Sequence, residues 1–233
     1  MGPKAARDYQ TEADRAVERA IAHALREAFP HHAILGEEFG LSGNTDPEAP
    51  VLVIDPIDGT TNFAWGIPHF GMVMAEVQDD IVISGAILDP MMDEMFTADR
   101  GQGAFVNGRQ MRLRAVDAPQ LALIGAGLPV PGQVRSVREE TYFSALRRAM
   151  AVTSGGRRLG SAALATAWVA AGRLDGFFED MLGLGDYGAG GLMVEEAGGI
   201  VTDFAGAAAG WKCGVVAGGP VIHPWLLAGL AEG

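Results

Sequence analysis

The sequence predicts a mixed α+β sandwich rather than a simple doubly wound sheet. Strand-like segments cluster in the first half of the chain, whereas strand-like and helix-like segments alternate in the second half. This order of elements favours helices packed on mixed sheets over a single parallel sheet. The composition changes near residues 116–120, and we expect an N-terminal subdomain, 1–117, and a C-terminal subdomain, 118–233.

Size and charge limit the class of protein. A chain of 233 residues with 48% hydrophobic and 20% charged residues can bury a sizeable core. The net charge of −12 argues against nucleic acid as a partner, because a phosphate backbone is bound by basic patches. Cys213 is the single cysteine, which excludes a disulfide within the chain and fits a reducing cytoplasm. We see no signal peptide and no apolar run of the ~20 residues that a membrane span needs, so we expect a cytoplasmic protein without membrane contact.

The first half of the chain begins with an amphipathic helix and continues with strands. A helix is predicted over residues 11–28, and Thr11 with Asp14 resembles a capping box. The apolar residues that recur there at steps of three and four, and form the expected buried stripe, are Ala13, Val17, Ala20, Ile21, Ala24, Leu25 and Ala28. A short strand-like piece at 33–40 and a polar loop precede the apolar strand 51–54. The further strands expected in this half are a hairpin of 70–77 with 81–88 and two short strands within 94–108.

The second half of the chain alternates between the two kinds of element. Apolar runs bounded by glycine indicate strands, and the alanine-rich run 161–172 indicates a buried helix. The other elements expected are a strand at 121–127, a helix at 139–150, a strand at 174–180, a helix after Asp186, strands at 199–204 and 214–219, and a short helix after His223.

The stretch VLVIDPIDGTTNF, residues 51–63, carries the main chemical signal. The strand delivers Asp55 and Asp58 to its carboxyl end, the edge at which sites of layered α/β proteins form. Gly59 permits an unusual φ, and the N–H groups of Gly59, Thr60 and Thr61 would face a phosphate if a helix begins there. Carboxylates with a main-chain carbonyl are hard oxygen ligands, which suit Mg²⁺ rather than zinc.

Simpler interpretations of these residues stay open at this stage. A bare D-x-x-D-G is equally well a tight turn in which Asp caps a helix. An aspartyl nucleophile is disfavoured, because phosphatases of that type carry D-x-D-G-T with one residue fewer between the acids. Arg157 and Arg158 either bind an anionic substrate or lie on a solvated loop.

Several segments together resemble the inositol monophosphatase family. The stretch VLVIDPIDGTTNFAWGIPHFGMVMA is similar to the family signature. In the expected order the chain also carries DYQTEAD, ILGEEFG, GQGAFVNG, GSAALATAWVAAGRLDGFFE and GDYGAGGLMVEEAGG. The resemblance implies a layered αβαβα sandwich and a lithium-sensitive, Mg²⁺-dependent phosphatase. It also implies a small phosphorylated metabolite as substrate and a homodimer.

The resemblance also assigns roles to individual residues. It implies that Glu37, Asp55, the carbonyl of Ile57, Asp58 and Asp186 hold Mg²⁺. The resemblance implies that Glu37, Asp55 and the carbonyl of Ile57 hold a first metal ion, and that Asp55 bridges to a second one held also by Asp58 and Asp186. Four acidic side chains placed together repel one another, and cations relieve that repulsion.

The remaining roles concern the attacking water and the substrate. The family pattern implies that Thr60 and Asp14 orient the attacking water, with Glu37 completing the catalytic group, and that the N–H groups of Gly59 and Thr60 bind phosphate. The residues implied to line the substrate pocket are Asp58, Ser161, Ala162, Glu179 and Asp186. Gly185 departs from the pattern, because the family usually has Trp at that position.

Three functions are compatible with the sequence. The first is hydrolysis of inositol 1-phosphate, and the second is the same chemistry on histidinol phosphate or, by analogy, fructose 1,6-bisphosphate. The third is a non-catalytic regulatory or binding protein on the same fold. The acids Glu37, Asp55, Asp58 and Asp186 are all retained, and this argues against the third function.

Overall fold

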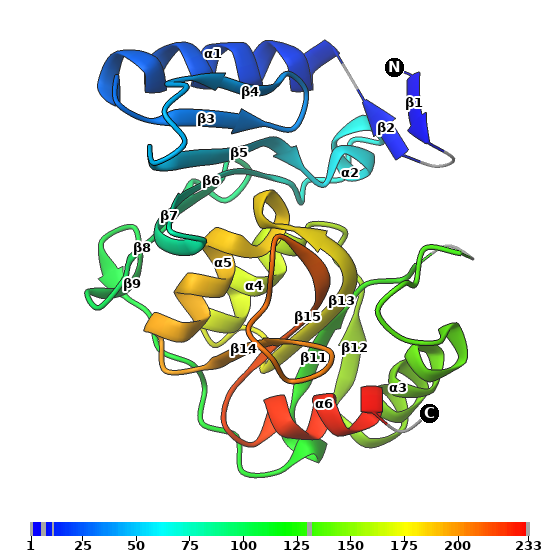
Figure 1. The fold of residues 1–233 in the computed structure, drawn as a ribbon. Helices are drawn as coiled ribbons and strands as arrows, with labels where there is room; N and C mark the ends of the chain where they lie inside the picture. The colour runs from blue at the N-terminus through cyan, green and yellow to red at the C-terminus, as the bar shows by residue number, and fades with distance from the viewer. Residues whose placement is uncertain (1, 6–7, 11, 130–131, 232–233) are drawn as a thin grey trace.

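The computed structural model describes residues 2–5, 8–10, 12–129 and 132–231. Helices and sheets alternate in layers, in the order helix, sheet, helices, sheet, helices (Figure 1). The predicted αβαβα sandwich is therefore confirmed. Within the described residues, no helix has the length and apolar character needed to cross a membrane.

The helices occupy three layers. Helix α1 (Glu12–Ala28) covers the outer face of the first sheet, and α4 (Ala162–Ala170) packs beside α5 (Leu184–Glu196) between the two sheets. Helices α3 (Glu139–Val152) and α6 (Ile222–Ala231) pack together on the far side of the second sheet. Each predicted helix is present, and the predicted cap residue Thr11 lies outside the described residues.

The first sheet has the strand order β10-β9-β8-β7-β6-β5-β3-β4. Neighbouring strands are antiparallel apart from the parallel pair β3 and β5. The predicted hairpin is confirmed as β6 and β7. The strand bounds are β3 (Ala33–Gly36), β4 (Gly40–Gly43), β5 (Val51–Asp58), β6 (Gly71–Gln78), β7 (Ile81–Asp89), β8 (Glu94–Asp99), β9 (Gly103–Val106) and β10 (Arg109–Gln110).

The second sheet has the strand order β12-β11-β13-β15-β14 and is mixed. Strand β11 is parallel to β12 and β13, whereas β15 is antiparallel to β13 and β14. Its strands are β11 (Leu123–Ala126), β12 (Gly155–Arg157), β13 (Gly176–Gly183), β14 (Ile200–Asp203) and β15 (Lys212–Gly218). The short elements outside both sheets are the ribbon β1 (Gly2–Ala5) with β2 (Asp8–Gln10), α2 (Thr60–Ala64) and the 3₁₀ turn η1 (Pro119–Leu121).

Among the described residues, three apolar clusters hold the five layers together, and the largest spans the interfaces on both sides of α4 and α5. The largest lies between the sheets, where Val73, Ile87 and Phe96 of the first sheet share a cluster with residues of α4 and α5. A second joins the second sheet to α3 and α6 through Tyr142 and Phe178. The third joins α1 to the first sheet through residues that include Ala22, Leu25, Ile34, Leu52 and Ile54.

The buried face of α1 differs from the predicted one. The apolar pattern predicted a core-facing stripe that included Ala20, Ala24 and Ala28, but these three residues are exposed. The buried residues of the helix are Asp14, Glu18, Ala22 and Leu25. The stripe therefore begins with two carboxylates, a pattern that sequence rules assign to solvent.

Helix α5 packs closely on both of its neighbours. A Cβ atom at Gly190 would lie 1.9 Å from Oγ1 of Thr166 on α4, and one at Gly85 of β7 would lie 2.8 Å from Ala189. Only glycine permits these approaches without moving the helix. The distance between α4 and α5 is therefore fixed at Gly190.

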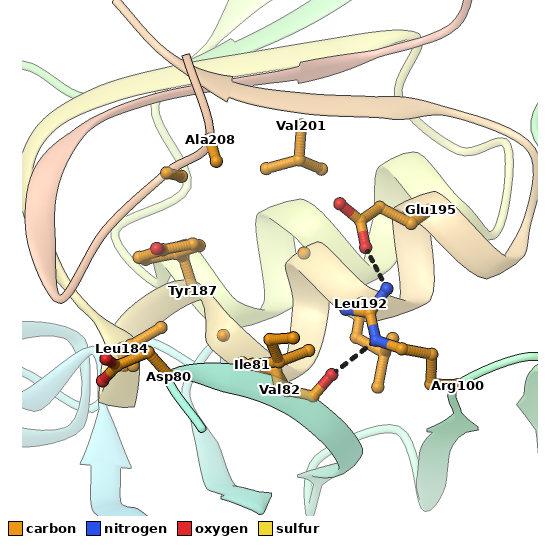
Figure 2. A pocket seen from close by; sticks show the side chains of 13 residues that line it. Asp80, Ile81, Val82, Arg100, Leu184, Tyr187, Leu192, Glu195, Val201 and Ala208 are labelled. Atoms are coloured by element: carbon orange, nitrogen blue, oxygen red, sulfur yellow. Dashed lines mark hydrogen bonds and ion pairs between the residues drawn. The ribbon is translucent and has the colours of Figure 1, made fainter. Parts of the chain in front are cut away.

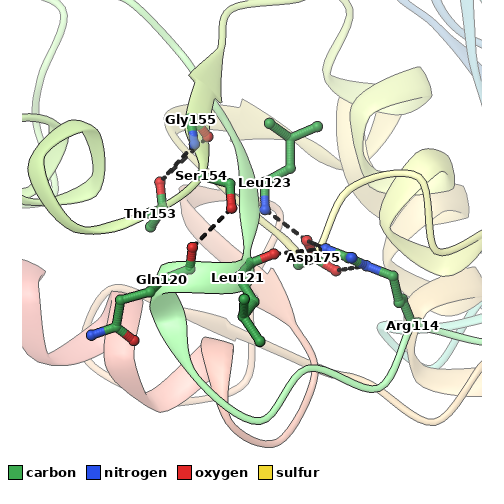
Figure 3. Close-up of polar contacts among 8 residues, drawn as sticks. All are labelled: Arg114, Gln120, Leu121, Leu123, Thr153, Ser154, Gly155 and Asp175. Carbon is green, nitrogen blue, oxygen red and sulfur yellow. Dashed lines mark hydrogen bonds and ion pairs between the residues drawn. The ribbon is translucent and has the colours of Figure 1, made fainter.

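The connection between the sheets is fastened by an ion pair (Figure 3). Nε and Nη2 of Arg114 donate to the two carboxylate oxygens of Asp175 at 2.8 and 2.5 Å, and the N–H of Leu123 donates to Oδ2 at 2.6 Å. Nη2 of Arg114 also donates to the carbonyl of Leu121 at 2.9 Å. The division into subdomains that we propose, at 117/118, lies in this connection.

Candidate metal and phosphate site

Strand β5 carries a bulge at the candidate site. Asp55 pairs with Val73 and Asp58 with Gly71, so three steps along β5 match two steps along β6. In a regular strand, residues three apart point to opposite faces, and one extra residue changes that parity. Pro56 sits inside the bulge, where a missing N–H is tolerated. The bulge thus lets Asp55 and Asp58 serve one site.

A short helix follows the bulge directly. Gly59 precedes α2 with φ 95°, a left-handed conformation that favours glycine. A Cβ at this position would also lie 3.1 Å from the carbonyl oxygen of Gly160. The sequence predicted a phosphate-facing turn on the condition that a helix begins here, and that condition is met at Thr60.

Three carboxylates converge at the junction of the sheets. One oxygen from each of Asp55, Asp58 and Asp186 lies within 4.8 Å of the other two. Burial, and then the charges of Asp58, Glu37 and Asp186, raise the pKa of Asp55 well above its ordinary range. Burial and the charge of Asp186 raise the pKa of Asp58 to about 7. Burial and mutual repulsion therefore both oppose ionisation of the three carboxylates.

Glu37 borders this group from the turn after β3. It lies in a cleft of about 520 Å³ together with Asp55 and Asp186, and its side chain hydrogen-bonds to Asp55. Its own side chain is exposed, in contrast to the buried Asp55 and Asp58. The structure thus places Glu37 beside the three-carboxylate group, with Asp55 as its contact.

The predicted water-orienting pair is also brought together. The hydroxyl of Thr60 lies 3.3 Å from Oδ1 of Asp14 and 3.1 Å from the carbonyl oxygen of Ile57, and it can donate to either. Asp14 is 1% exposed, so the helix α1 delivers a buried carboxylate to the turn that follows β5.

Asp58 is held by the start of α4. Oδ2 of Asp58 accepts a short hydrogen bond from the hydroxyl of Ser161 and another from the N–H of Ala163 at 2.8 Å. Ser161 is the N-cap of α4 and also accepts from the N–H of Leu164. Ala162, predicted to line the substrate pocket, is buried at the first position of the same helix. The orientation of the Asp58 carboxylate is therefore fixed by α4, which lies far from β5 along the chain.

Asp186 lies inside a helix rather than before one. The predicted helix after Asp186 begins two residues earlier, at Leu184, because Oδ2 of Asp186 accepts a hydrogen bond from the N–H of Gly183 at 2.7 Å and caps the first turn. Gly185 precedes it, and a Cβ there would be in ordinary contact with Asp55, at 3.7 Å.

Glu179 lines a second cleft, of about 530 Å³, with Arg158 and Lys212. Burial and the charge of Asp58 raise the pKa of Glu179 to about 8, while Arg158 acts in the opposite direction. A Cβ at Gly127 would lie 2.4 Å from Glu179, so the absence of a side chain there makes room for the carboxylate. Lys212 also lines the cleft that holds Glu37 and Asp186, so the two clefts adjoin.

A further cavity, of about 200 Å³, lies between α5, β7 and the loop after β14 (Figure 2). The guanidinium of Arg100 pairs there with Glu195 at 3.1 Å and donates to the carbonyl of Val82 at 2.9 Å. The hydroxyl of Tyr187 donates to the carbonyl of Gly210 at 2.6 Å. Glu37, Asp55, Asp58 and Asp186 do not line this cavity, so it does not form part of the candidate site.

The carboxylate group fits a divalent cation. Its donors are hard oxygen atoms from three side chains, and the raised pKa values show that the group is costly to ionise without a positive partner. A cation bound there would favour the ionised carboxylates and remove that cost.

Sequence reasoning missed three residues that shape the site. The amide of Asn62 donates to the carbonyls of His69 and Leu159, at 2.7 and 2.8 Å, and so ties α2 to the loop before α4. Glu18 is buried on α1, and Lys212 lines both clefts. Asn62 follows the two threonines directly, and an amide side chain this soon after the turn at Gly59 is a signal that could have identified it.

Comparison with known proteins agrees with this geometry. The profile of the inositol monophosphatase family matches residues 2–232. A Pseudomonas aeruginosa protein named Nus factor SuhB is 44% identical over 89% of this chain and 76% of its own length. A Rhizobium meliloti inositol-1-monophosphatase is 43% identical over 85% of this chain and 73% of its own.

Solved structures agree as well. The crystal structure of the extragenic suppressor protein suhB from Bartonella henselae matches with a TM-score of 0.93 and 41% identity, over 100% of this chain and 88% of that one. The profile, the relatives and this structure together give one assignment. The chain belongs to the inositol monophosphatase family.

Proposed function

We propose that this protein is a Mg²⁺-dependent phosphomonoesterase that hydrolyses inositol 1-phosphate. The observation that carries the proposal is the convergence of Asp55, Asp58 and Asp186 beside Glu37, at the end of a strand that leads into a glycine turn. A relative that is 43% identical carries the name inositol-1-monophosphatase.

The chain's own residues would hold the metal ion and orient the attacking water. Glu37, Asp55, Asp58, Asp186 and the carbonyl of Ile57 would hold Mg²⁺, which when bound would lower the pKa of water and offset charge on the phosphate. The proposed catalytic pair is Asp14 and Thr60: with its hydroxyl donating to Asp14, Thr60 can accept a hydrogen bond and orient the attacking water.

Substrate binding follows from the neighbouring groups. The N–H groups of Gly59 and Thr60 would bind phosphate oxygens at the start of α2. Glu179 would accept a hydrogen bond from a substrate hydroxyl, and Ser161 and Ala162 would line the same pocket. Arg158 and Lys212 border the pocket, and their positive charge would favour a negatively charged substrate. The choice between inositol 1-phosphate, histidinol phosphate and fructose 1,6-bisphosphate depends on these groups.

The test is phosphate release from the three substrates, with Mg²⁺ and with EDTA. We expect release that requires Mg²⁺ and is fastest with inositol 1-phosphate. Equal release in EDTA would contradict the metal-dependent mechanism, and a strong preference for histidinol phosphate would change the substrate. We also expect inhibition by millimolar lithium, on the resemblance to the family.

A regulatory role is the second candidate. Several relatives, including the one from Pseudomonas aeruginosa, carry the name Nus factor SuhB. If the purified protein binds Mg²⁺ but releases phosphate from none of the substrates, the proposal of an enzyme fails and this candidate is favoured.

A further inference from the structure

Helix α1 presents two buried acids to the site. Asp14 and Glu18 are four residues apart, so they lie on the same face of the helix, one above the other. Each is 1% exposed. Asp14 lies beside the turn after β5, through Thr60. Glu18 faces a different turn, the one that joins β3 to β4 and carries Glu37.

The carboxylate of Glu18 binds that turn through two consecutive N–H groups. Oε2 accepts a hydrogen bond from the N–H of Glu38 at 2.8 Å, and Oε1 accepts one from the N–H of Phe39 at 3.0 Å. A charged acceptor with two backbone donors makes a strong and directional contact. The two N–H groups come immediately after Glu37, so they fix the backbone on its C-terminal side.

The other side of Glu37 is fixed by the first sheet. Gly36 is the last residue of β3 and pairs with Ile54, next to Asp55, in the parallel ladder. A Cβ at Gly36 would lie 1.9 Å from Oε1 of Glu18. Glycine at this position therefore makes room for the carboxylate, and the two residues form one built feature.

We infer that Glu18 is a positioning residue that holds Glu37 beside Asp55 and so sets the affinity of the site for its cation. The inference rests on the proposed function in assigning Glu37 to the metal. A buried acid that only filled space would be replaceable by an apolar residue, because burying a carboxylate is costly unless its hydrogen bonds are made. Instead, both carboxylate oxygens of Glu18 accept hydrogen bonds from the turn that carries Glu37, an expected metal ligand.

The experiment compares Glu18→Gln with Glu76→Gln. Glutamine has the volume of glutamate but a single acceptor oxygen, so one of the two N–H groups loses its partner. Glu76 is the control, because it is a partly buried acid of the first sheet that bonds to Nε2 of His32 at 2.9 Å and pairs with Leu52, toward the other end of β5 from Asp58. Calorimetric titration of the metal-free proteins with Mg²⁺ gives the affinity, and thermal unfolding in EDTA gives the stability.

We expect Glu18→Gln to weaken Mg²⁺ binding by about 10–100-fold, the range for residues that orient metal ligands. The Mg²⁺ affinity of Glu76→Gln should stay within about twofold of that of the original protein, even if its melting temperature falls as much as that of Glu18→Gln. In a Glu37→Gln background, Glu18→Gln should weaken binding much less, because it acts through Glu37.

The outcomes separate this inference from the proposed function. Unchanged Mg²⁺ affinity in Glu18→Gln, or an equal loss with and without Glu37, would overturn the positioning role. Should Glu18→Gln fail to fold, Gly36→Ala, which displaces the same carboxylate, takes its place. Metal affinity is measured without substrate, so it stays informative even if the protein hydrolyses no phosphate ester.

Discussion

Two regions of this molecule bury carboxylates, and they treat them differently. At the connection between the sheets, Asp175 receives both donors of the Arg114 fork and the N–H of Leu123 (Figure 3). At the junction of the sheets, the charges around Asp55 are those of other acids. Asp175 is 4% exposed, as is Asp55, so burial does not explain the difference.

The difference lies in which partner neutralises the charge. A buried carboxylate must be hydrogen-bonded and balanced by a cation, or its pKa rises. The chain supplies an arginine to Asp175, and the pKa of Arg114 rises in return. For Asp55 and Asp58, burial and then the charges of neighbouring acids raise the pKa instead, as expected of carboxylates that would bind an external cation. The charge of the neighbouring groups thus distinguishes the proposed binding group around Asp55 from the structural carboxylate of Asp175.

The largest effect should come from removing one charge of the acidic group. Asp58→Asn keeps the shape of the side chain, and its amide cannot ligate as a carboxylate does. We expect the turnover to fall about 10³-fold, which corresponds to about 4 kcal/mol of transition-state stabilisation. Phosphate release measures the turnover, and circular dichroism checks the fold. If Asp58→Asn turns over substrate as fast as the original protein, the assignment of Asp58 to the proposed metal site is contradicted.

Disrupting the ion pair of Arg114 and Asp175 should lower the stability of the protein rather than its turnover. Arg114→Met leaves Asp175 buried without its cation, and we expect a loss of about 2 kcal/mol in the free energy of unfolding. This is below the ~3–5 kcal/mol of fully buried pairs, because Arg114 is itself half exposed. Urea denaturation measures the loss. The double variant Arg114→Met with Asp175→Asn should recover part of it, since no buried charge remains; no recovery would show that the arginine stabilises by packing.

The acidic group should also make the metal-free protein sensitive to pH. The pKa of Asp58 is raised from its ordinary 3.8 to about 7, so the unfolded chain releases this proton first. The stability of the metal-free protein, compared with Asp58→Asn, should therefore fall as the pH rises from about 4 to about 7. We expect a difference of at least about 1 kcal/mol, or about 2–4 °C in melting temperature, measured in EDTA. Excess Mg²⁺, which would bind the ionised carboxylates, should abolish this fall with pH in the original protein, and a fall that persists in Mg²⁺ would contradict the assignment.

The smallest effect should come from the wall of the site. Gly185 lies in the first turn of α5, and a Cβ there would be in ordinary contact with Asp55 at 3.7 Å and Val53 at 3.8 Å. Gly185→Ala should therefore raise the free energy of unfolding by about 0.5 kcal/mol, since alanine loses less backbone freedom in a helix. Thermal unfolding measures the change. A loss of stability would show that the packing around Gly185 cannot accommodate the added methyl group.

Much of the fold could be predicted from the pattern of apolar residues. The hairpin of β6 and β7 and the helix α3 have regular periods, so their positions followed from the sequence. The strands that sequence analysis missed, such as β10 and β12, are short edge strands whose existence depends on a neighbour. Strand β5 continues past Pro56, where sequence rules end a strand, because the bulge accommodates the proline.

The candidate site was less accessible to sequence rules alone. Asp55 and Asp58 stand out because they follow an apolar strand, but the convergence of Asp186 on them depends on the packing of α5 between the sheets. The resemblance to a family supplied that link in advance. Glu18 had no such signal, because an acid on an amphipathic helix ordinarily faces water.

The close packing at Gly190 has a consequence for ion size. Helix α4 holds Asp58 through Ser161, and α5 carries Asp186. The distance between these helices is limited at Gly190, where a Cβ would meet Oγ1 of Thr166 at 1.9 Å. A larger residue at position 190 would move the helices apart and change the gap between the two carboxylates. In the proposed metal site, the size of the cation that fits between Asp58 and Asp186 would thus depend on a residue that contacts neither carboxylate.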